Sequence, residues 1–212
     1  GNGKDQGFFI QLEQEILQPL AGSGKLFTLT LNNLKWAQVK NAASAIYANR
    51  QSLELQKKNY PERFELCNQN RCTIIDNVFI HSSAQIDETA VIGPNVSIGK
   101  NVIVGPGVRI RESIILDDCV IEDHSLIIHT IIGRNSKVGK WTRIEGTSVD
   151  PDPNKPFAKI KNLPLFNQNG KLNPSTTIIG NGCSVSSEIV LLNTIILPSK
   201  ELTRSFKNEI IL

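Results

Sequence analysis

Three histidines are the side chains of this sequence best suited to acid–base or metal chemistry. His81 could serve as a general base beside a substrate cleft, and the imidazoles of His81, His124 and His129 could together hold a zinc ion with one water. Nothing near His81 indicates a coenzyme cleft, and the spacings of 43 and 48 residues from His81 do not match whole turns of the repeat described below. We therefore expect structural roles for all three, with no catalytic residue and no metal ion.

Two further groups could bind phosphate or metal. The segment Gly22-Ser23-Gly24-Lys25 superficially resembles a phosphate loop, but the serine or threonine that should follow the lysine is missing. The cysteines Cys67, Cys72, Cys119 and Cys183 are too few for a disulfide scaffold, and no second pair with zinc-ligand spacing accompanies Cys67 and Cys72. We expect reduced thiols and no cofactor.

The composition limits the class of protein. The 212 residues are 40% hydrophobic and carry a net charge of +3, which is typical of a folded chain and too mild a charge to indicate nucleic-acid binding. No apolar run reaches the 18 or more residues of a membrane span, and no secretory leader opens the chain, so we expect a cytoplasmic protein without a membrane. Methionine is absent altogether, which indicates a piece of a longer protein.

An aliphatic residue recurs every six positions, and this repeat predicts the fold. Twelve successive positions starting at Val78 are apolar: Val78, Ala84, Ala90, Val96, Val102, Val108, Ile114, Val120, Leu126, Ile132, Val138 and Ile144. A second series runs from Ile80 to Leu116, and a third comprises Ile179, Val185, Leu191 and Leu197. Neither a helix nor an ordinary strand has a period of six.

Each six-residue unit repeats one pattern of residue types. Glycine follows the aliphatic residue, and asparagine or glycine often stands two places later, as in Ile92-Gly93-Pro94-Asn95 and Ile98-Gly99-Lys100-Asn101. Glycine allows close approach of two backbones, and asparagine tolerates positive φ, so the chain can turn a corner every six residues. Three such faces make one triangular coil, and coils stack at roughly 4.8 Å. The fold predicted is mainly β, a parallel β-helix whose aliphatic residues point inward.

The glycine-bearing position moves from the Ile80 series to the Ile132 series. This shift, near 110–114, predicts irregular coils with a bulge. The spacing does not determine handedness; resemblance to hexapeptide-repeat proteins implies a left-handed coil.

The flanking residues follow other rules. The sequence predicts a turn or short strand leading into a helix over 8–17, a strand over 25–31 and an amphipathic helix over 37–58 that stops before Pro61. We expect this helix to cover the open edge of the first coil. Over about 146–177 the repeat is interrupted by a proline-rich loop with a turn at 167–170, and such loops often bind a partner.

The order of elements resembles a known family. The relevant residues are Trp36-Ala37-Gln38-Val39-Lys40, Val138-Gly139-Lys140-Trp141, Arg143-Ile144-Glu145-Gly146-Thr147 and the closing Ile196-Leu197-Pro198-Ser199-Lys200-Glu201-Leu202. They resemble the C-terminal half of eukaryotic GDP-mannose pyrophosphorylase, and the Asp-Pro-Asp-Pro loop is more similar to its alpha, regulatory-type subunit. The resemblance covers the chain from about Leu12. Ser199 departs from the family, in which histidine is frequent.

The resemblance implies an assembly and regulatory role. The family's enzyme makes GDP-mannose and diphosphate from GTP and mannose 1-phosphate, but its nucleotide loop, sugar-contacting residues and metal-binding aspartate are missing here, so the fragment is expected to be non-catalytic. Residues 1–70 are then the remnant of a nucleotidyltransferase domain with a linker helix, and 71–212 the β-helix domain. Expected partners are other copies and the catalytic beta subunit. The candidate contacts are Asp150, Pro151, Asp152, Pro153, Lys155, Pro198, Lys200 and Glu201.

Two other functions remain open at this stage. One is a stand-alone hexapeptide-repeat acyltransferase with His124 or His81 as general base, and the other is a purely structural oligomerisation prism. The sequence upstream of Gly1 would separate the assembly and regulatory role from these two alternatives, because a nucleotidyltransferase domain should precede Gly1. Binding of acetyl-coenzyme A would reveal the acyltransferase.

Overall fold

The chain divides into a small N-terminal unit and a large unit. The computed structural model describes residues 10–30, 36–65, 72–151, 154 and 164–212, and the boundary between the units follows residue 35. The small unit contains a π-helical turn, Leu12–Leu17, and a short helix α1, Gln18–Leu20. Residues 25–30 form no strand, so that prediction is wrong over the residues described. A strand needs a neighbour for its backbone N–H and C=O groups, and residues 10–30, the part of this unit that the structure describes, contain no strand to pair with.

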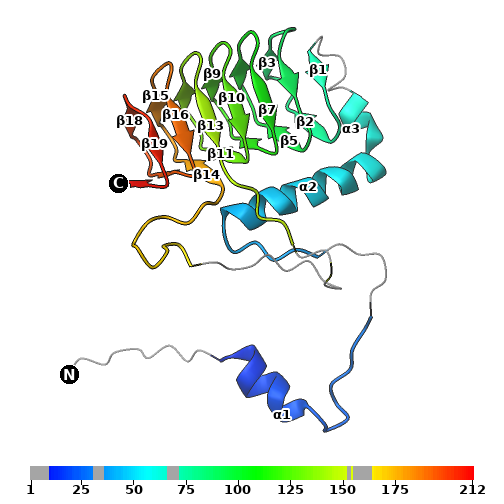
Figure 1. Cartoon of the computed structure of the whole chain (residues 1–212). Coiled ribbons are helices and arrows are strands. Elements are labelled where there is room, and N and C mark those ends of the chain that lie inside the picture. Colours follow the sequence, from blue (N-terminus) through cyan, green and yellow to red (C-terminus); the bar gives the residue numbers. More distant parts are fainter. Residues whose placement is uncertain (1–9, 31–35, 66–71, 152–153, 155–163) are drawn as a thin grey trace, which may run out of the picture. The chain divides into compact units, whose positions relative to one another are not determined.

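The large unit is the predicted parallel β-helix, with three flat walls that we call sheets A, B and C (Figure 1). All ladders within the three sheets are parallel, and the fold is consistent with the left-handed form. Sheet A comprises β1 Thr73–Ile74, β4 Val91–Ile92, β7 Arg109–Arg111, β10 Leu126–Ile128, β13 Arg143–Glu145, β16 Val190–Leu192 and β19 Phe206–Lys207. Sheet B comprises β2 Val78–Ile80, β5 Val96–Ile98, β8 Ile114–Ile115, β11 Thr130–Ile132, β14 Thr177–Ile179, β17 Ile195–Ile196 and β20 Ile210–Ile211. Sheet C comprises β3 Gln85–Ile86, β6 Ile103–Val104, β9 Val120–Ile121, β12 Lys137–Val138, β15 Ser184–Val185 and β18 Glu201–Leu202.

The inward residues form one aliphatic core along the axis. Ile92, Ile98 and Val104 point inward from the three walls of one coil, and all are essentially without solvent contact. Burying each such side chain contributes about 1.5–3 kcal/mol, so the column of isoleucines and valines is the main source of stability. The predicted inward positions Val96, Val102 and Ile132 are likewise buried.

The coil shortens from eighteen to seventeen residues after the second coil. Ile92 pairs with Ile110, eighteen residues on, whereas Ile110 pairs with Ile127 and Ile127 with Ile144, each seventeen residues on. The ladders stay one-to-one across the change, so the predicted bulge is wrong: one residue is lost at the corner that leads from sheet A to sheet B. The six-residue series therefore loses its register with the core. Four residues that it predicted to point inward are partly or fully exposed: Leu116, Val120, Leu126 and Leu197.

The shortened corner between sheets A and B has its own hydrogen-bonding scheme. Glu112 and His129 turn the chain with positive φ, and Ser113 and Thr130 follow them with buried side chains. The backbone N–H of Thr130 donates to Ser113 Oγ at 3.1 Å, and the hydroxyl of Thr130 donates to the Ile128 carbonyl at 2.8 Å. Small hydroxyl side chains therefore replace aliphatic ones where the tighter corner leaves less room.

Helix α2, Ala42–Asn59, packs along the side of the prism instead of over its open end as predicted (Figure 1). It begins later than the predicted residue 37 because Asn41 and Ser44 cap it reciprocally: the Ser44 N–H donates to Asn41 Oδ1 at 2.8 Å, and the Asn41 N–H donates to Ser44 Oγ at 3.0 Å. Pro61 lies beyond its end, as predicted, and opens a short helix α3, Pro61–Glu65.

The strands of sheet B contain no charged residue, which explains why α2 packs there. Ala43, Ile46 and Leu53 on one side of the helix are buried, and Ser97 Oγ of β5 donates to Asn49 Oδ1 at 2.6 Å. Among the described residues, every helix is too short or too polar to span a lipid bilayer.

Candidate functional site at the root of the inserted loop

The three histidines lie at three different corners of the prism. His81 follows sheet B, where its Nδ1 lies 2.9 Å from Ser83 Oγ; His124 follows sheet C and stacks on Trp141 with ring centroids 4.3 Å apart. His129 follows sheet A and is half-buried. The structure therefore does not bring them together, and the described residues contain no group of three or more histidine, cysteine or acidic side chains able to hold a metal.

The other chemically suggestive segments take structural roles. Ser23 Oγ donates to the Leu20 carbonyl at 2.6 Å, so residues 22–25 close α1 in an exposed turn. The described residues 26–30 that follow directly form no helix whose N-terminus could receive a phosphate. Cys72, Cys119 and Cys183 are free thiols buried in the prism, and burial raises the pKa of the Cys119 thiol to about 11. Cys67 lies outside the described residues.

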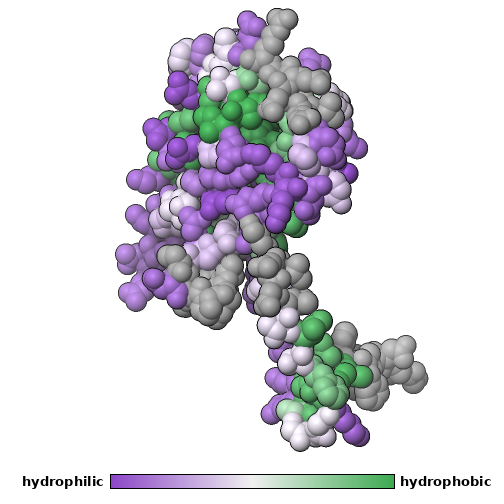
Figure 2. Space-filling model, turned by 90° about the vertical axis from the view of Figure 1, so that its right-hand side faces the viewer, coloured by the Kyte–Doolittle hydropathy of each residue, from purple (hydrophilic) through white to green (hydrophobic). Residues whose placement is uncertain are grey.

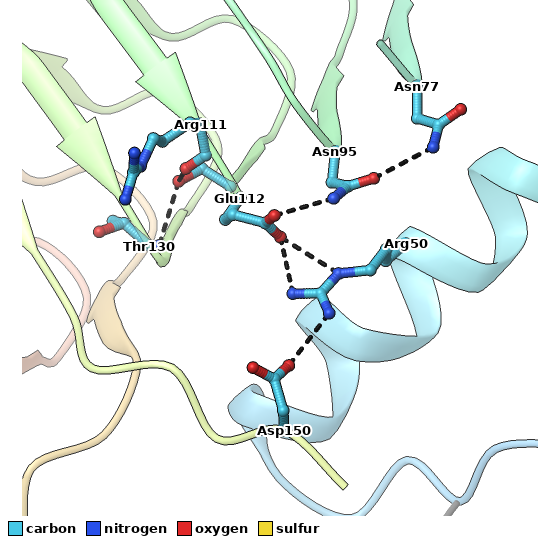
Figure 3. A network of polar contacts seen from close by, with 8 residues as sticks. Arg50, Asn77, Asn95, Arg111, Glu112, Thr130 and Asp150 are labelled. Carbon is cyan, nitrogen blue, oxygen red and sulfur yellow. Dashed lines mark hydrogen bonds and ion pairs between the residues drawn. The ribbon is translucent and has the colours of Figure 1, made fainter. Parts of the chain in front are cut away.

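The strongest polar cluster joins three distant segments through Arg50 of α2 (Figure 3). Its guanidinium donates to Glu112 Oε2 from Nη2 at 3.0 Å and from Nε at 3.3 Å, and its Nη1 donates to Asp150 Oδ1 at 3.0 Å. Glu112 stands at a shortened corner of the prism, and Asp150 lies in the first part of the inserted loop. One arginine therefore ties the helix, the prism and the loop together.

Asparagines continue the cluster along the prism. Asn95 donates to the second oxygen of Glu112 at 2.8 Å and accepts from Asn77 at 3.4 Å (Figure 3). Asn77, Asn95 and Glu112 occupy the same corner of successive coils, each with positive φ. The carboxylate of Glu112 is thus hydrogen-bonded from two sides, which fixes the direction it presents to Arg50.

The electrostatics of the cluster favour its charged form. Burial works against the charge on Arg50, but the hydrogen bonds and negative charges of Glu112 and Asp150 outweigh it and hold the pKa of the guanidinium above its ordinary value. Burial lowers the pKa of the neighbouring His129, an effect that Glu112 partly opposes and Arg111 reinforces. His129 therefore favours its neutral form here.

A hollow beside this cluster is lined by Tyr47, Arg50, His129, Val149 and Asp150, with α2 on one side and the loop on the other. Its free space is about that of one water molecule, which is far below what a nucleotide or coenzyme needs. The arrangement positions a loop and offers no cavity for a substrate.

The inserted loop leaves and re-enters the prism at one point. The N–H of Thr147 donates to the Ser175 carbonyl at 2.9 Å, so the two ends of the loop lie together. The predicted turn at 167–170 is confirmed: the Gly170 N–H donates to the Asn167 carbonyl, and Phe166 and Leu172 form an antiparallel bridge. Phe166 is exposed on this small hairpin.

The candidate contact residues fall into two separate groups. Asp150 and Pro151 lie at the loop root, whereas Pro198 and Lys200 lie at the corner between sheets B and C, directly before Glu201, the first residue of β18. Asp152, Pro153 and Lys155 lie outside the described residues. Sequence reasoning did not find Arg50 or Glu112, because no motif marks them: they are 62 residues apart and meet only through the fold.

The fold and this site define a hexapeptide-type β-helix that carries a loop fastened to its flank. The chain belongs to the family described as the GMPPB C-terminal domain, whose model matches residues 74–211. It is 56% identical over 217 aligned residues to the mannose-1-phosphate guanylyltransferase regulatory subunit alpha of Drosophila melanogaster, covering 99% of this chain and 49% of that protein.

Other relatives give the same picture. The human protein of the same description is 45% identical, and the alignment covers 96% of this chain and 48% of the human protein. The mannose-1-phosphate guanyltransferase alpha-B of Xenopus laevis is 51% identical, and the alignment covers 96% of this chain and 47% of that protein. The chain thus spans about half the length of these relatives. An acetyltransferase domain of PglB from Neisseria gonorrhoeae superposes with a TM-score of only 0.29 at 13% identity, over 62% of this chain and 51% of its own, which is too low to assign acyl transfer.

Proposed function

We propose that this chain is the assembly and regulatory β-helix portion of an alpha-type subunit of mannose-1-phosphate guanylyltransferase, the enzyme also called GDP-mannose pyrophosphorylase. In the parent complex, GTP and mannose 1-phosphate would give GDP-mannose and diphosphate, with the chemistry carried by another subunit or domain. The observation that supports this most is the match, over nearly the whole of this chain and about half of each relative, to proteins described as regulatory subunits. The loop held by Arg50 is the feature best suited to contact a partner.

The N-terminal residues support a further domain in the intact protein. Phe27 and Leu29 are 86% and 83% exposed, and Figure 2 shows hydrophobic surface on their small unit. Apolar side chains this exposed normally pack against something. We propose that residues 1–70 complete a nucleotidyltransferase domain and lead into the β-helix of residues 71–212, and that the protein acts in the cytoplasm and self-associates.

Deleting the loop tests its role in the partnership. Because Thr147 and Ser175 are hydrogen-bonded, residues 148–172 can be replaced by a short glycine linker without stretching the prism. We expect the variant of the intact subunit to keep its β-helix, measured by circular dichroism and thermal melting, and to bind the catalytic beta subunit at least about tenfold more weakly in a titration. Unchanged affinity would refute the loop's role.

The acyltransferase alternative has a separate test. A hexapeptide acyltransferase would bind acetyl-coenzyme A with micromolar affinity, and a calorimetric titration of the intact subunit would detect it. We expect no heat of binding. Saturable binding that is lost in His124→Ala or His81→Ala would overturn the proposed function in favour of acyl transfer.

A further inference from the structure

The outer surface of sheet A differs in chemistry from the other two walls. Its strands carry four basic side chains, Arg109, Arg111, Arg143 and Lys207, against a single carboxylate, Glu145. The strands of sheet B carry no charged residue and pack against α2, and those of sheet C carry only Lys137 and Glu201. Two of these basic residues lie close together on β7, where Arg109 and Arg111 are on either side of one inward residue.

These arginines alternate with apolar side chains on the neighbouring strand. Leu126 lies in register with Arg109 on one side and Arg143 on the other, and Ile128 lies between Arg111 and Glu145. Leu126 and Ile128 are partly exposed, so the arginines lie beside apolar surface, and arginine is one of the residue types enriched at protein interfaces.

Two of the arginines have no anionic partner among the described residues. Arg143 is paired with Glu145, its Nε donating to Oε2 at 2.9 Å, but within the described part of the chain no carboxylate forms an ion pair with Arg109 or Arg111, and both are exposed. Helix α2 lies against sheet B, and neither α2 nor α3, the two helices described in the large unit, covers sheet A (Figure 1). The wall is therefore free to dock a partner.

Trp141 stands at the corner where the chain enters sheet A. Its side chain is 62% exposed, and its backbone has a φ of +57°, which bulky residues rarely adopt. The imidazole of His124 from the preceding coil stacks on the indole, so the ring is held in place before any partner arrives. Tryptophan and arginine are the residue types that contribute most to binding energy at interfaces.

We infer that the outer surface of sheet A, with Trp141 at its edge, is the docking surface for an acidic patch on a protein partner. Docking buries Arg109 and Arg111, and buried unpaired charges are costly, so the partner must supply carboxylates. A second copy presenting the same wall would set net positive charge against net positive charge, which disfavours a symmetric self-contact of this surface. The identity of the partner rests on the proposed function, under which it is the catalytic beta subunit.

Charge reversal in the intact subunit tests this inference. The double variant Arg109→Glu/Arg111→Glu is compared with the matched control Lys100→Glu/Lys137→Glu, which makes the same change in net charge away from sheet A. Thermal melting establishes that each variant folds. If the first variant does not fold, Arg109→Gln/Arg111→Gln and Trp141→Ala take its place. Affinity for the beta subunit is then measured by titration at two salt concentrations.

We expect the sheet A variants to bind at least about thirtyfold more weakly, the control to stay within about threefold of the unaltered protein, and the affinity of the unaltered protein to fall with salt. Sheet A variants that bind as the unaltered protein does would overturn the inference and leave the proposed function intact. Absence of binding by the unaltered subunit would overturn both. A change in self-association confined to the sheet A variants, seen by sedimentation, would show that a second copy occupies the wall and would also overturn it.

Discussion

Removing the guanidinium of Arg50 should destabilise the large unit, and its two carboxylate partners should contribute unequally. The side chains of Arg50 and Glu112 are only 24% and 14% exposed, whereas that of Asp150 is 51% exposed. Arg50→Met keeps the aliphatic part of the side chain and leaves the carboxylate of Glu112 partly buried without its cation. Because Asn95 still donates to Glu112, we expect a cost of about 2 kcal/mol, below the 3–5 kcal/mol typical of a fully buried pair.

The loop side of the same cluster should matter less. Asp150→Asn removes a half-exposed ion pair in which solvent screens the charges, so we expect a loss of less than about 1 kcal/mol. The double variant Arg50→Met/Glu112→Gln should cost less than the sum of the two single variants, because each single change already breaks the same pair.

Urea denaturation followed by circular dichroism gives these free energies of unfolding. A 2 kcal/mol loss in a unit of this size corresponds to a fall in Tm of about 4–8 °C. If Asp150→Asn costs as much as Arg50→Met, or if Arg50 and Glu112 contribute additively, the assignment of Glu112 as the main partner is refuted.

Two further predictions concern the prism itself. A methyl group on Gly139 would lie 2.5 Å from the backbone nitrogen of Ser187 in the next coil, so Gly139→Ala should destabilise the large unit by about 2 kcal/mol in denaturant unfolding. An unchanged free energy of unfolding would refute close coil contact at Gly139. Burial raises the pKa of Cys119 to about 11, above its value in the unfolded chain, so the stability contributed by the neutral thiol is present below about pH 9 and is lost between there and pH 11. Compared with Cys119→Ala, the unaltered protein should lose more stability over this range, and its Cys119 thiol should resist thiol reagents at pH 8 until the chain unfolds; parallel pH profiles would contradict this.

The sequence predicted the β-helix because its signal is local. Each coil buries aliphatic residues such as Ile92 and Ile98 at fixed steps, and the corner residues turn the chain in the same way each time. The shortened coils were not predicted, because Ser113, Cys119 and Thr130 take inward positions that an aliphatic search passes over. The search then moved to neighbouring aliphatic residues that lie outside the core.

The candidate site was beyond prediction for a different reason. Arg50 meets Glu112 and Asp150 across 62 and 100 residues of chain. The Asp-Pro-Asp-Pro loop made Asp150 a candidate, but no motif marks Arg50 or Glu112. Only the packing of α2 along sheet B brings them together. The loop itself was predictable, since its prolines interrupt a strict repeat, but its attachment to the helix was not.

The most direct test of the proposed role is sedimentation of the intact subunit with a catalytic mannose-1-phosphate guanylyltransferase beta subunit. The account predicts a complex of fixed stoichiometry at micromolar concentrations that forms with this β-helix present and is lost when residues 71–212 are removed from the otherwise folded subunit. Two subunits that sediment independently throughout that range, or a complex unaffected by the removal, would contradict it.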